Sequence, residues 1–353
     1  MRALIVTCMR NEAPFLLEWI AYHKLIGFTD FLVYSNDCED GTDLMLDRLA
    51  ENGVLTHERN RAGGKKSVQW RALSRACHHP LTAKADWIYG SDVDEFLCIH
   101  AGAGHLDDLF AACPEAPGFA IPWRMFGNGG VVKFEDTPIT QQFTRAAPDA
   151  LLWPWRAVQF KSLYRNDGRY NRLGVHRPKL KEGESHGVWV DGNGQPLAET
   201  PGTVVPTPLS RYALAQINHY ALGSMEGFLV KVARGKPNHS NDAIDLAYWS
   251  DRNFCDVEDS TILRHSAALA QAVEDLRNDP EIDRLHQEGV AWRHKRIAAL
   301  MQDSDSFYLF SRLMQMPATQ VLSHAHQHQL FKGLMQVRRL QIARKNNEDQ
   351  ADN

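Results

Sequence analysis

Apolar and polar positions follow two different patterns along the first hundred residues. Continuous apolar and β-branched runs are typical of parallel strands that are covered on both faces. We expect such strands at residues 3–9, 30–37, 53–60 and 85–96. Apolar residues at helical spacing, with Pro14 in the first turn of one segment and Gly27 at its end, predict helices between the strands. These helices are expected at residues 11–27, 38–53 and 65–80. The order predicts an α/β fold with an open, mostly parallel sheet and helices on both faces.

The pattern changes after about residue 114. Gly, Pro and aromatic residues become frequent up to residue 220, which predicts short strands and long loops. Helical spacing returns after residue 224, and a basic amphipathic segment lies near the end. We expect helices at residues 224–235, 266–302 and 330–345. The predicted organisation is a first half at 1–113, a second half of the same domain at 114–235, a helical extension at 236–345 and a disordered tail at 346–353.

Charge and composition exclude several classes of protein. The 353 residues carry a net charge of −4, which argues against a nucleic-acid-binding surface. The six cysteines lie far apart without a CxxC pair, as expected of reduced thiols in the cytoplasm. No run approaches about 20 apolar residues, so no transmembrane segment is expected. We expect a cytoplasmic protein. The basic helix at 330–345 leaves open a peripheral contact with the inner face of the membrane. An alternative is that this helix packs on its own domain.

Three carboxylates follow the fourth predicted strand, in the sequence DWIYGSDVDEFL. Strand alternation would place Asp92 and Asp94 on the same side, and Glu95 comes directly after them. Ligands of open α/β sheets bind beyond the carboxyl ends of the strands. Paired carboxylates there suit a hard divalent cation that shares its shell with substrate phosphates. The alternative is a solvated acidic loop, because a bare DxD motif often occurs by chance.

The segments TCMRNEAPFLLEWIAYHKLIGFTDFLVYSNDCEDGT, QWRAL and DWIYGSDVDEFL, in this order, resemble the nucleotide-sugar half of glycosyltransferase family 2. The resemblance is closest to a bacterial branch related to glycosyltransferase family 92, with the GT-A fold, and covers about residues 1–235. It implies a nucleotide-sugar-binding half at 1–113 and a loop-rich acceptor side at 114–235. It also implies a metal-dependent hexosyltransferase of polysaccharide or glycoconjugate synthesis. The donor would be a nucleotide-diphospho sugar, the acceptor a carbohydrate or glycoconjugate hydroxyl, and the metal Mn²⁺ or Mg²⁺.

The resemblance also implies roles for residues at the first strand ends. Thr7, Arg10, Asn11 and Glu12 would border the nucleotide, and Asp37 would face its base. Asn11 and Glu12 could instead begin and cap a helix. Asp37 could be an ordinary turn residue.

Further roles fall on the helix after the third strand and on the acidic motif. Lys65 and Gln69 would close over the nucleotide, or they could be solvated helix residues. The resemblance implies that Asp92 reaches the ribose or a metal-bound water, that Asp94 binds the metal and that Glu95 orients the loop. His219 would complete the metal shell, with His176 as a rival. A hydrogen-bonded core histidine is the alternative for His219. Arg172, Arg177 and Lys231 are candidates for stabilising the leaving diphosphate.

The general base is the least determined residue. Family 2 enzymes usually invert the anomeric centre, which requires a carboxylate that accepts the proton of the acceptor hydroxyl. The sequence KFEDTP offers Asp136 for this role, with Glu135, Glu184 and Glu226 as rivals. Two other functions stay open at this point. One is a nucleotidyltransferase acting on sugar phosphates, although the first strand lacks the glycine-rich loop expected there. The other is a non-catalytic sugar-binding or scaffold protein.

Overall fold

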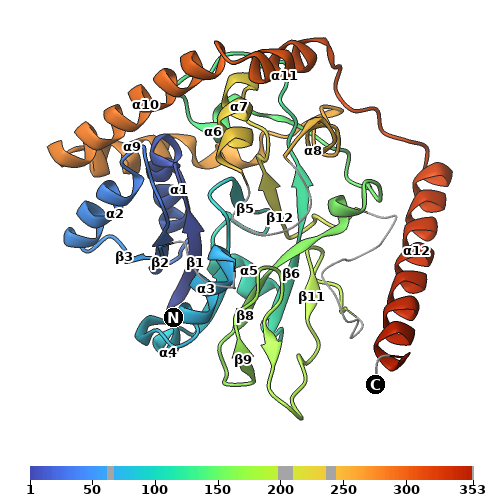
Figure 1. The fold of residues 1–353 in the computed structure, drawn as a ribbon. Helices are drawn as coiled ribbons and strands as arrows, with labels where there is room; N and C mark the ends of the chain where they lie inside the picture. Colours follow the sequence, from blue (N-terminus) through green and yellow to red (C-terminus); the bar gives the residue numbers. More distant parts are fainter. Residues whose placement is uncertain (62–66, 198–209, 236–243, 352–353) are drawn as a thin grey trace.

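A computed structural model of the chain describes residues 1–61, 67–197, 210–235 and 244–351 (Figure 1). The central sheet contains nine strands. These are β1 (Ala3–Met9), β2 (Asp30–Ser35), β3 (Thr56–Arg59), β4 (Trp87–Gly90), β5 (Glu95–Ile99), β6 (Gly118–Met125), β8 (Phe160–Arg165), β11 (Val190–Asp191) and β12 (Ala215–His219). Eight strands follow the order β3-β2-β1-β4-β8-β6-β12-β5, and β11 pairs with β6. The sheet therefore combines strands from both sides of residue 113.

Most neighbouring strands of the sheet run parallel. The pairs β1–β2, β2–β3, β1–β4, β6–β12 and β6–β11 are parallel, whereas β8 is antiparallel to β4 and β6, and β5 is antiparallel to β12. The predicted α/β fold with a mostly parallel sheet is thereby confirmed. The sequence indicated one strand at 85–96, but the structure has two strands, β4 and β5, with the acidic motif in the turn between them.

Helices cover both faces of the sheet, as predicted. The first helices are α1 (Ala13–Leu25), α2 (Thr42–Glu51) and α3 (Val68–Ala76). Alternate residues of β1 point to opposite faces: Ile5 packs in one buried apolar cluster with Trp19 of α1, and Leu4 packs in another with Leu73 of α3. Because both faces of β1 are buried, its sequence is apolar except for Thr7.

The segment between β5 and β12 contains mostly short elements and loops, as the sequence predicted. They are α5 (Leu106–Ala112), α6 (Ile139–Gln142), β7 (Arg145–Ala146), η1 (Trp155–Val158), β9 (Tyr170–Arg172) and β10 (Lys179–Leu180). Elsewhere the short elements are α4 (Pro80–Lys84), α8 (Leu246–Ser250), β13 (Val257–Glu258) and η2 (Thr261–His265).

The C-terminal segment is helical, as expected. Its helices are α7 (Met225–Arg234), α9 (Ser266–Arg277), α10 (Pro280–Leu300), α11 (Ser304–Gln315) and α12 (His324–Ala351). The single helix predicted at 266–302 is two helices. Asp279 caps α10 by accepting from the amides of Glu281 and Ile282, and Pro280 starts that helix without an amide donor.

Helix α12 stands at the edge of the molecule, apart from the other helices (Figure 1). Its backbone is helical to Ala351, into the segment 346–353 where the sequence predicted a disordered tail. Polar residues such as those of this segment are compatible with a helix that continues from a formed one. The domain boundaries proposed from the sequence stay predictions. Within the described part of the chain, no helix combines the length and apolar character needed to cross a bilayer.

Candidate functional site

A cleft of about 500 Å³ opens at the carboxyl ends of the parallel strands. Arg10 follows β1, Asp37 follows β2, Asp92 and Asp94 follow β4, and His219 ends β12, and all five line the cleft. The sheet order places the carboxyl ends of β1 and β2 on one side of the acidic turn. The carboxyl ends of β6 and β12, and the amino end of the antiparallel strand β8, lie on the other side. The cleft therefore lies where ligands bind in open α/β sheets.

The acidic motif forms a tight turn whose backbone is held in place. The amide of Glu95 donates to the Asp92 carbonyl at 3.1 Å, and the Asp92 amide donates to Glu95 Oε2 at 3.0 Å. The amide of Tyr220, just after β12, donates to the Asp94 carbonyl at 2.8 Å. Asp92 and Asp94 both line the cleft although they lie in a turn and not on a strand. Their common direction thus depends on the turn and not on strand alternation.

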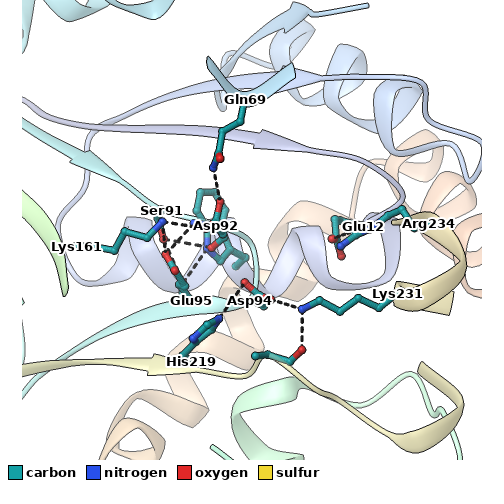
Figure 2. Close-up of polar contacts among 12 residues, drawn as sticks. Glu12, Gln69, Ser91, Asp92, Asp94, Glu95, Lys161, His219, Lys231 and Arg234 are labelled. Atoms are coloured by element: carbon teal, nitrogen blue, oxygen red, sulfur yellow. Dashed lines mark hydrogen bonds and ion pairs between the residues drawn. The ribbon is translucent and has the colours of Figure 1, made fainter. Parts of the chain in front are cut away.

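Asp92 is bound by two side chains of the protein (Figure 2). Lys161 of β8 places its ammonium 2.9 Å from Oδ2, and Gln69 in the first turn of α3 donates to Oδ1 at 3.4 Å. The sequence had placed Gln69 beside the nucleotide; the structure places it on the cleft wall, in contact with Asp92. Lys65 lies outside the described residues. The oxygens of Asp92 therefore already have cationic and amide donors.

Lys161 also joins Glu95, which is completely buried. The two side chains lie 3.2 Å apart, and Glu95 Oε1 has no hydrogen-bond partner among the described residues. Burial raises the pKa of Glu95 because the charged form loses its hydration. Burial opposes the charge on Lys161, but Asp92 and Glu95 outweigh it and raise its pKa. Glu95 thus contacts the turn from inside the protein, and its orienting role stays a prediction.

Asp94 lies between a lysine and a histidine (Figure 2). Lys231 of α7 donates to Oδ2 at 2.7 Å, and His219 Nε2 lies 3.9 Å from Oδ1. Burial opposes ionisation of Asp94, but Lys231 and His219 outweigh this effect, and the pKa of the carboxyl lies well below its usual range. Burial lowers the pKa of His219 to about 3, so its imidazole is neutral at physiological pH. The site therefore presents a carboxylate and a neutral imidazole side by side.

His176, the rival of His219, also lines the cleft but does not face Asp94 in the same way. Its Nδ1 lies 2.8 Å from the Phe160 carbonyl, and its ring packs against Trp123. Burial lowers the pKa of His176 to about 4. Of the two histidines, His219 is the one within 4 Å of the acidic motif.

The loops after β1 and β2 are tied together on one side of the cleft. Arg10 donates to the Asp37 carbonyl at 3.1 Å and to Glu39 at 2.8 Å, while Asn11 Oδ1 accepts from the Glu39 amide at 2.8 Å. Asn11 and Asp37 have φ of 56° and 46°, in the left-handed region that Asn and Asp tolerate better than most residues. These contacts fix the wall on which the sequence placed the nucleotide base.

Glu12 and Thr7 have different surroundings from these loop residues. Glu12 precedes α1 and forms an ion pair with Arg234 at the end of α7, and both residues line the cleft. Thr7 is buried within β1 and lines a small cavity beside Gln69, Asp92 and Lys161, not the main cleft. Thr7 thus lies behind the acidic motif.

The structure does not bring the candidate general bases together in the cleft. Asp136 accepts from His286 of α10 at 3.0 Å, and it is not among the cleft residues. Glu135 lines a second cavity, which shares Glu12, Asp94 and Lys231 with the cleft. Glu226 accepts from the Phe134 amide at 2.9 Å, and Glu184 is exposed in the loop between β10 and β11.

Several cleft residues have no recognisable pattern in the sequence, and of the three basic candidates for the diphosphate only one lines the cleft. Lys231 is in the cleft, whereas Arg172 is exposed on β9 and Arg177 packs over Phe160 and Trp189. Cleft residues that no sequence argument singled out include Trp123, Arg156, Arg234, Tyr248 and Arg252. Lys161, which lines the small cavity behind the acidic motif and binds Asp92, was not singled out either. A lysine within the apolar strand QFKSLY was a signal for Lys161, because a buried charge needs a partner.

The geometry can be compared with known proteins. A sequence model of a protein family, described as glycosyltransferase family 92, matches residues 5–193. A family 92 protein of Oryza sativa subsp. japonica is 28% identical over 190 residues, which cover 51% of this chain and 30% of the relative. A family 92 protein of Arabidopsis thaliana is 31% identical over 293 residues, which cover 72% of this chain and 44% of the relative. The chain thus spans less than half the length of these relatives.

Solved structures with a similar arrangement include the S. aureus protein TarS. A crystal structure of its residues 1–349 has 16% sequence identity and a TM-score of 0.27, and the match covers 47% of each chain. A second structure of the same protein, described as a complex with UDP-GlcNAc, has 17% identity and a TM-score of 0.27. That match covers 47% of this chain and 46% of TarS 1–349.

Proposed function

Because this chain belongs to glycosyltransferase family 92, we propose that it transfers a sugar from a nucleotide-diphospho sugar to a hydroxyl acceptor. The observation that carries the proposal is the position of Asp94, between Lys231 and His219 at the centre of the cleft. Membership of family 2 and of its bacterial branch remains a prediction from the sequence. So do the roles in polysaccharide or glycoconjugate synthesis and the location at the inner face of a membrane.

The nucleotide is assigned to the side of the cleft formed by the loops after β1 and β2. Arg10, Asn11 and Asp37 line or support this side, and their mutual hydrogen bonds keep its shape before any ligand arrives. Gln69 approaches from α3 and, with Asp92, closes the wall toward the centre. A preformed wall lowers the entropy that binding would otherwise lose.

The leaving diphosphate is assigned to the centre of the cleft. Lys231 and Arg234 place two cationic side chains there, and each is held by a carboxylate, Asp94 and Glu12 respectively. Held cations stabilise charge that develops on a leaving group without reorganising during the reaction. Of the three candidates from the sequence we therefore keep Lys231, and Arg234 takes the place of Arg172 and Arg177 among the diphosphate-binding residues that we propose.

The donor atoms near Asp94 fit a divalent cation in part. Asp94 Oδ1 and His219 Nε2 lie 3.9 Å apart, a separation compatible with two bonds of about 2 Å to one cation. No group of three or more His, Cys, Asp or Glu side chains suited to a metal occurs in the described part of the chain. Substrate phosphates and water commonly complete such shells. Asp94 and His219 would hold Mn²⁺ or Mg²⁺, which would supply positive charge for the diphosphate. Asp92 fits the role of a metal ligand less well, because Lys161 and Gln69 already bind its two carboxylate oxygens.

The acceptor is assigned to the other side of the cleft, above β8, β6 and β12. Trp123 and Gln159 line this side, and aromatic faces and amides are suited to sugar rings and hydroxyls. Attack from this side, opposite the leaving diphosphate, corresponds to the inversion expected from the sequence. The general base stays unassigned, because Asp136 is bound to His286 and Glu135 faces the neighbouring cavity.

A binding screen tests this proposal. Nucleoside diphosphates with different bases would be titrated into the protein by calorimetry, with and without Mn²⁺. We expect one of them to bind in a Mn²⁺-dependent manner, and Asp94→Asn to lower its affinity at least about tenfold. Asp305→Asn, on the exposed first turn of α11, serves as the matched control and should leave the affinity unchanged. If no nucleoside diphosphate binds, or if Asp94→Asn binds as tightly as the wild type, the proposal is wrong.

A further inference from the structure

Arg252 is a buried cation on the wall of the cleft. Only 5% of the residue is exposed, yet it lines the cleft together with Arg156. Its guanidinium lies 3.6 Å from the centre of the Tyr248 ring, and Nη1 donates to the Tyr248 carbonyl at 3.1 Å. Nε is buried and has no hydrogen-bond partner among the described residues. The planar group is thus fixed by its own neighbours, while part of its donor capacity is unused.

The charge of Arg252 is poorly compensated by the described part of the protein. No carboxylate of the described residues lies within ion-pair distance of it, and the nearest acidic side chain in sequence, Asp251, pairs with Arg156 at 3.7 Å. Burial lowers the pKa of Arg252, with Arg156 as a smaller contribution, and the opposite effects of Tyr248, Asp251 and Asp94 do not outweigh it. A buried charge without a partner is costly, so a ligand that brings an anion into contact with Arg252 gains a charge-assisted hydrogen bond.

The position of Arg252 decides which part of a substrate it meets. It follows α8 and lines the cleft with Arg156 of η1, directly before β8. The Tyr248 ring on which it stacks also lies 5.6 Å from Lys231 Nζ. The nucleotide side of the cleft is formed by β1 and β2, at the other side of the acidic turn. Lys231 and Arg234 already serve the proposed diphosphate position between the two. Arg252 therefore lies beside the proposed diphosphate position, on the side assigned to the transferred sugar and the acceptor.

We propose that Arg252 binds an anionic group, a carboxylate or a phosphate, carried by the transferred sugar or by the acceptor sugar. The inference rests on the proposed function for the identity of the ligand as a sugar, but the anion site itself depends only on Arg252 and its surroundings. The flat guanidinium, held against Tyr248, matches the two oxygens of such a group. The substrate class is then an acidic or phosphorylated sugar and not a neutral hexose.

Calorimetric titrations at a fixed salt concentration test this inference with five probes. UDP-glucuronate and UDP-glucose represent a donor with and without the anion, and glucuronate and glucose represent the acceptor in the same way. Glucose 6-phosphate adds the phosphate form. We expect at least one anionic probe to bind about tenfold or more tightly than its neutral counterpart. Arg252→Gln should remove this difference, and Arg252→Lys should keep part of it. Arg296→Gln, an exposed arginine of α10, should have no effect.

The outcomes separate this inference from the proposed function. If the two UDP-sugars bind equally and Arg252→Gln weakens both, Arg252 serves the diphosphate and the inference is wrong. If no probe carrying a carboxylate or phosphate on its sugar binds better than the neutral one, it is also wrong. Binding of glucuronate or glucose 6-phosphate that depends on Arg252, without any nucleotide binding, would support the anion site and contradict the nucleotide-sugar proposal. If Arg252→Gln melts at a much lower temperature than the wild type, Arg156→Gln replaces it in the test, because the Arg156 side chain is 22% exposed and its loss should disturb the fold less. Arg156→Gln should then lower the affinity for the anionic probe about threefold or more.

Discussion

Lys231 and Asp94 lie 2.7 Å apart, although 137 residues separate them in the sequence. The same ammonium donates to the Ala221 carbonyl at 2.7 Å, so two acceptors fix its position. Helix α7 thereby brings a cation to the acidic turn from the opposite wall of the cleft. The pairing gives Asp94 a cationic partner in the absence of substrate. Under the proposed function, the same ammonium would already be in place for the leaving diphosphate.

Replacing Lys231 tests its proposed contact with the diphosphate. We expect Lys231→Gln to lower the affinity for a nucleoside diphosphate about tenfold, and to change the affinity for the matching monophosphate less, because the lost cation faces the second phosphate. Calorimetric titrations of both nucleotides measure the difference. Lys295→Gln, an exposed lysine of α10, is the matched control. An equal loss for both nucleotides would contradict the assignment of Lys231 to the diphosphate.

Lys161 should contribute mainly to stability. It is 2% exposed at its side chain and joins Asp92 and Glu95, so Lys161→Met leaves two carboxyl groups without their cation. Removing one partner of a buried ion pair typically costs about 3–5 kcal/mol of unfolding free energy. Urea denaturation measures this loss. Glu95→Gln should lower the unfolding free energy less in the Lys161→Met protein than in the wild type. Additive losses from the two substitutions would argue against an interaction between Lys161 and Glu95.

Local sequence patterns were sufficient for most elements of the first half of the fold, but not for the break between β4 and β5. The strand at Ala3–Met9 and the helix at Ala13–Leu25 follow from an apolar run and from helical spacing, which depend on neighbouring residues only. Asp37, Asp92 and Asp94 could be predicted to meet because parallel strands end at one edge of a sheet. The prediction of Asp94 in the cleft therefore needed no tertiary information.

The other side of the cleft could not be predicted in this way. Lys161 comes from an antiparallel strand inserted between β4 and β6, and Arg252 comes from a loop after α8. Lys161 lies 69 residues from its partner Asp92 in the sequence, and no periodicity in the sequence encodes such a pairing. Asp136 was chosen for a short acidic motif, whereas its hydrogen bonds to His286 depend on how α10 packs.

Asp37 should contribute to nucleotide affinity through its charge. Asp37→Asn removes the charge and keeps a residue that tolerates the left-handed backbone at φ 46°, so the loop should keep its shape. We expect the affinity for the nucleotide found by the screen to fall several-fold, about 1 kcal/mol, with an unchanged melting temperature. The control is Asp107→Asn, because Asp107 is exposed. Asp43 is less suitable as a control because it forms an ion pair with Arg59. Unchanged affinity would remove Asp37 from the nucleotide site.

Buried neutral histidines should make the fold sensitive to acid. His23 is completely buried; the Leu97 amide donates to Nε2 at 3.5 Å, so Nδ1 carries the proton and donates to the Trp19 carbonyl at 2.8 Å. Burial lowers the pKa of His23 to about 3, below the value near 6.5 of an unfolded chain. Between these values the unfolded state binds one more proton, so this contribution to stability is present above pH 6.5 and is lost as the pH falls.

The loss attributable to His23 is about 1.4 kcal/mol per pH unit below pH 6.5. His23→Gln should be less stable than the wild type at pH 7.5, because it disturbs a packed core, but its unfolding free energy should fall less steeply toward pH 5. The gap between the two proteins therefore narrows with acid. Urea denaturation at pH 7.5, 6.5, 5.5 and 5 measures both slopes, and His328→Gln, exposed on α12, should behave as the wild type. Parallel curves for His23→Gln and the wild type would mean that His23 binds its proton equally well in the folded state.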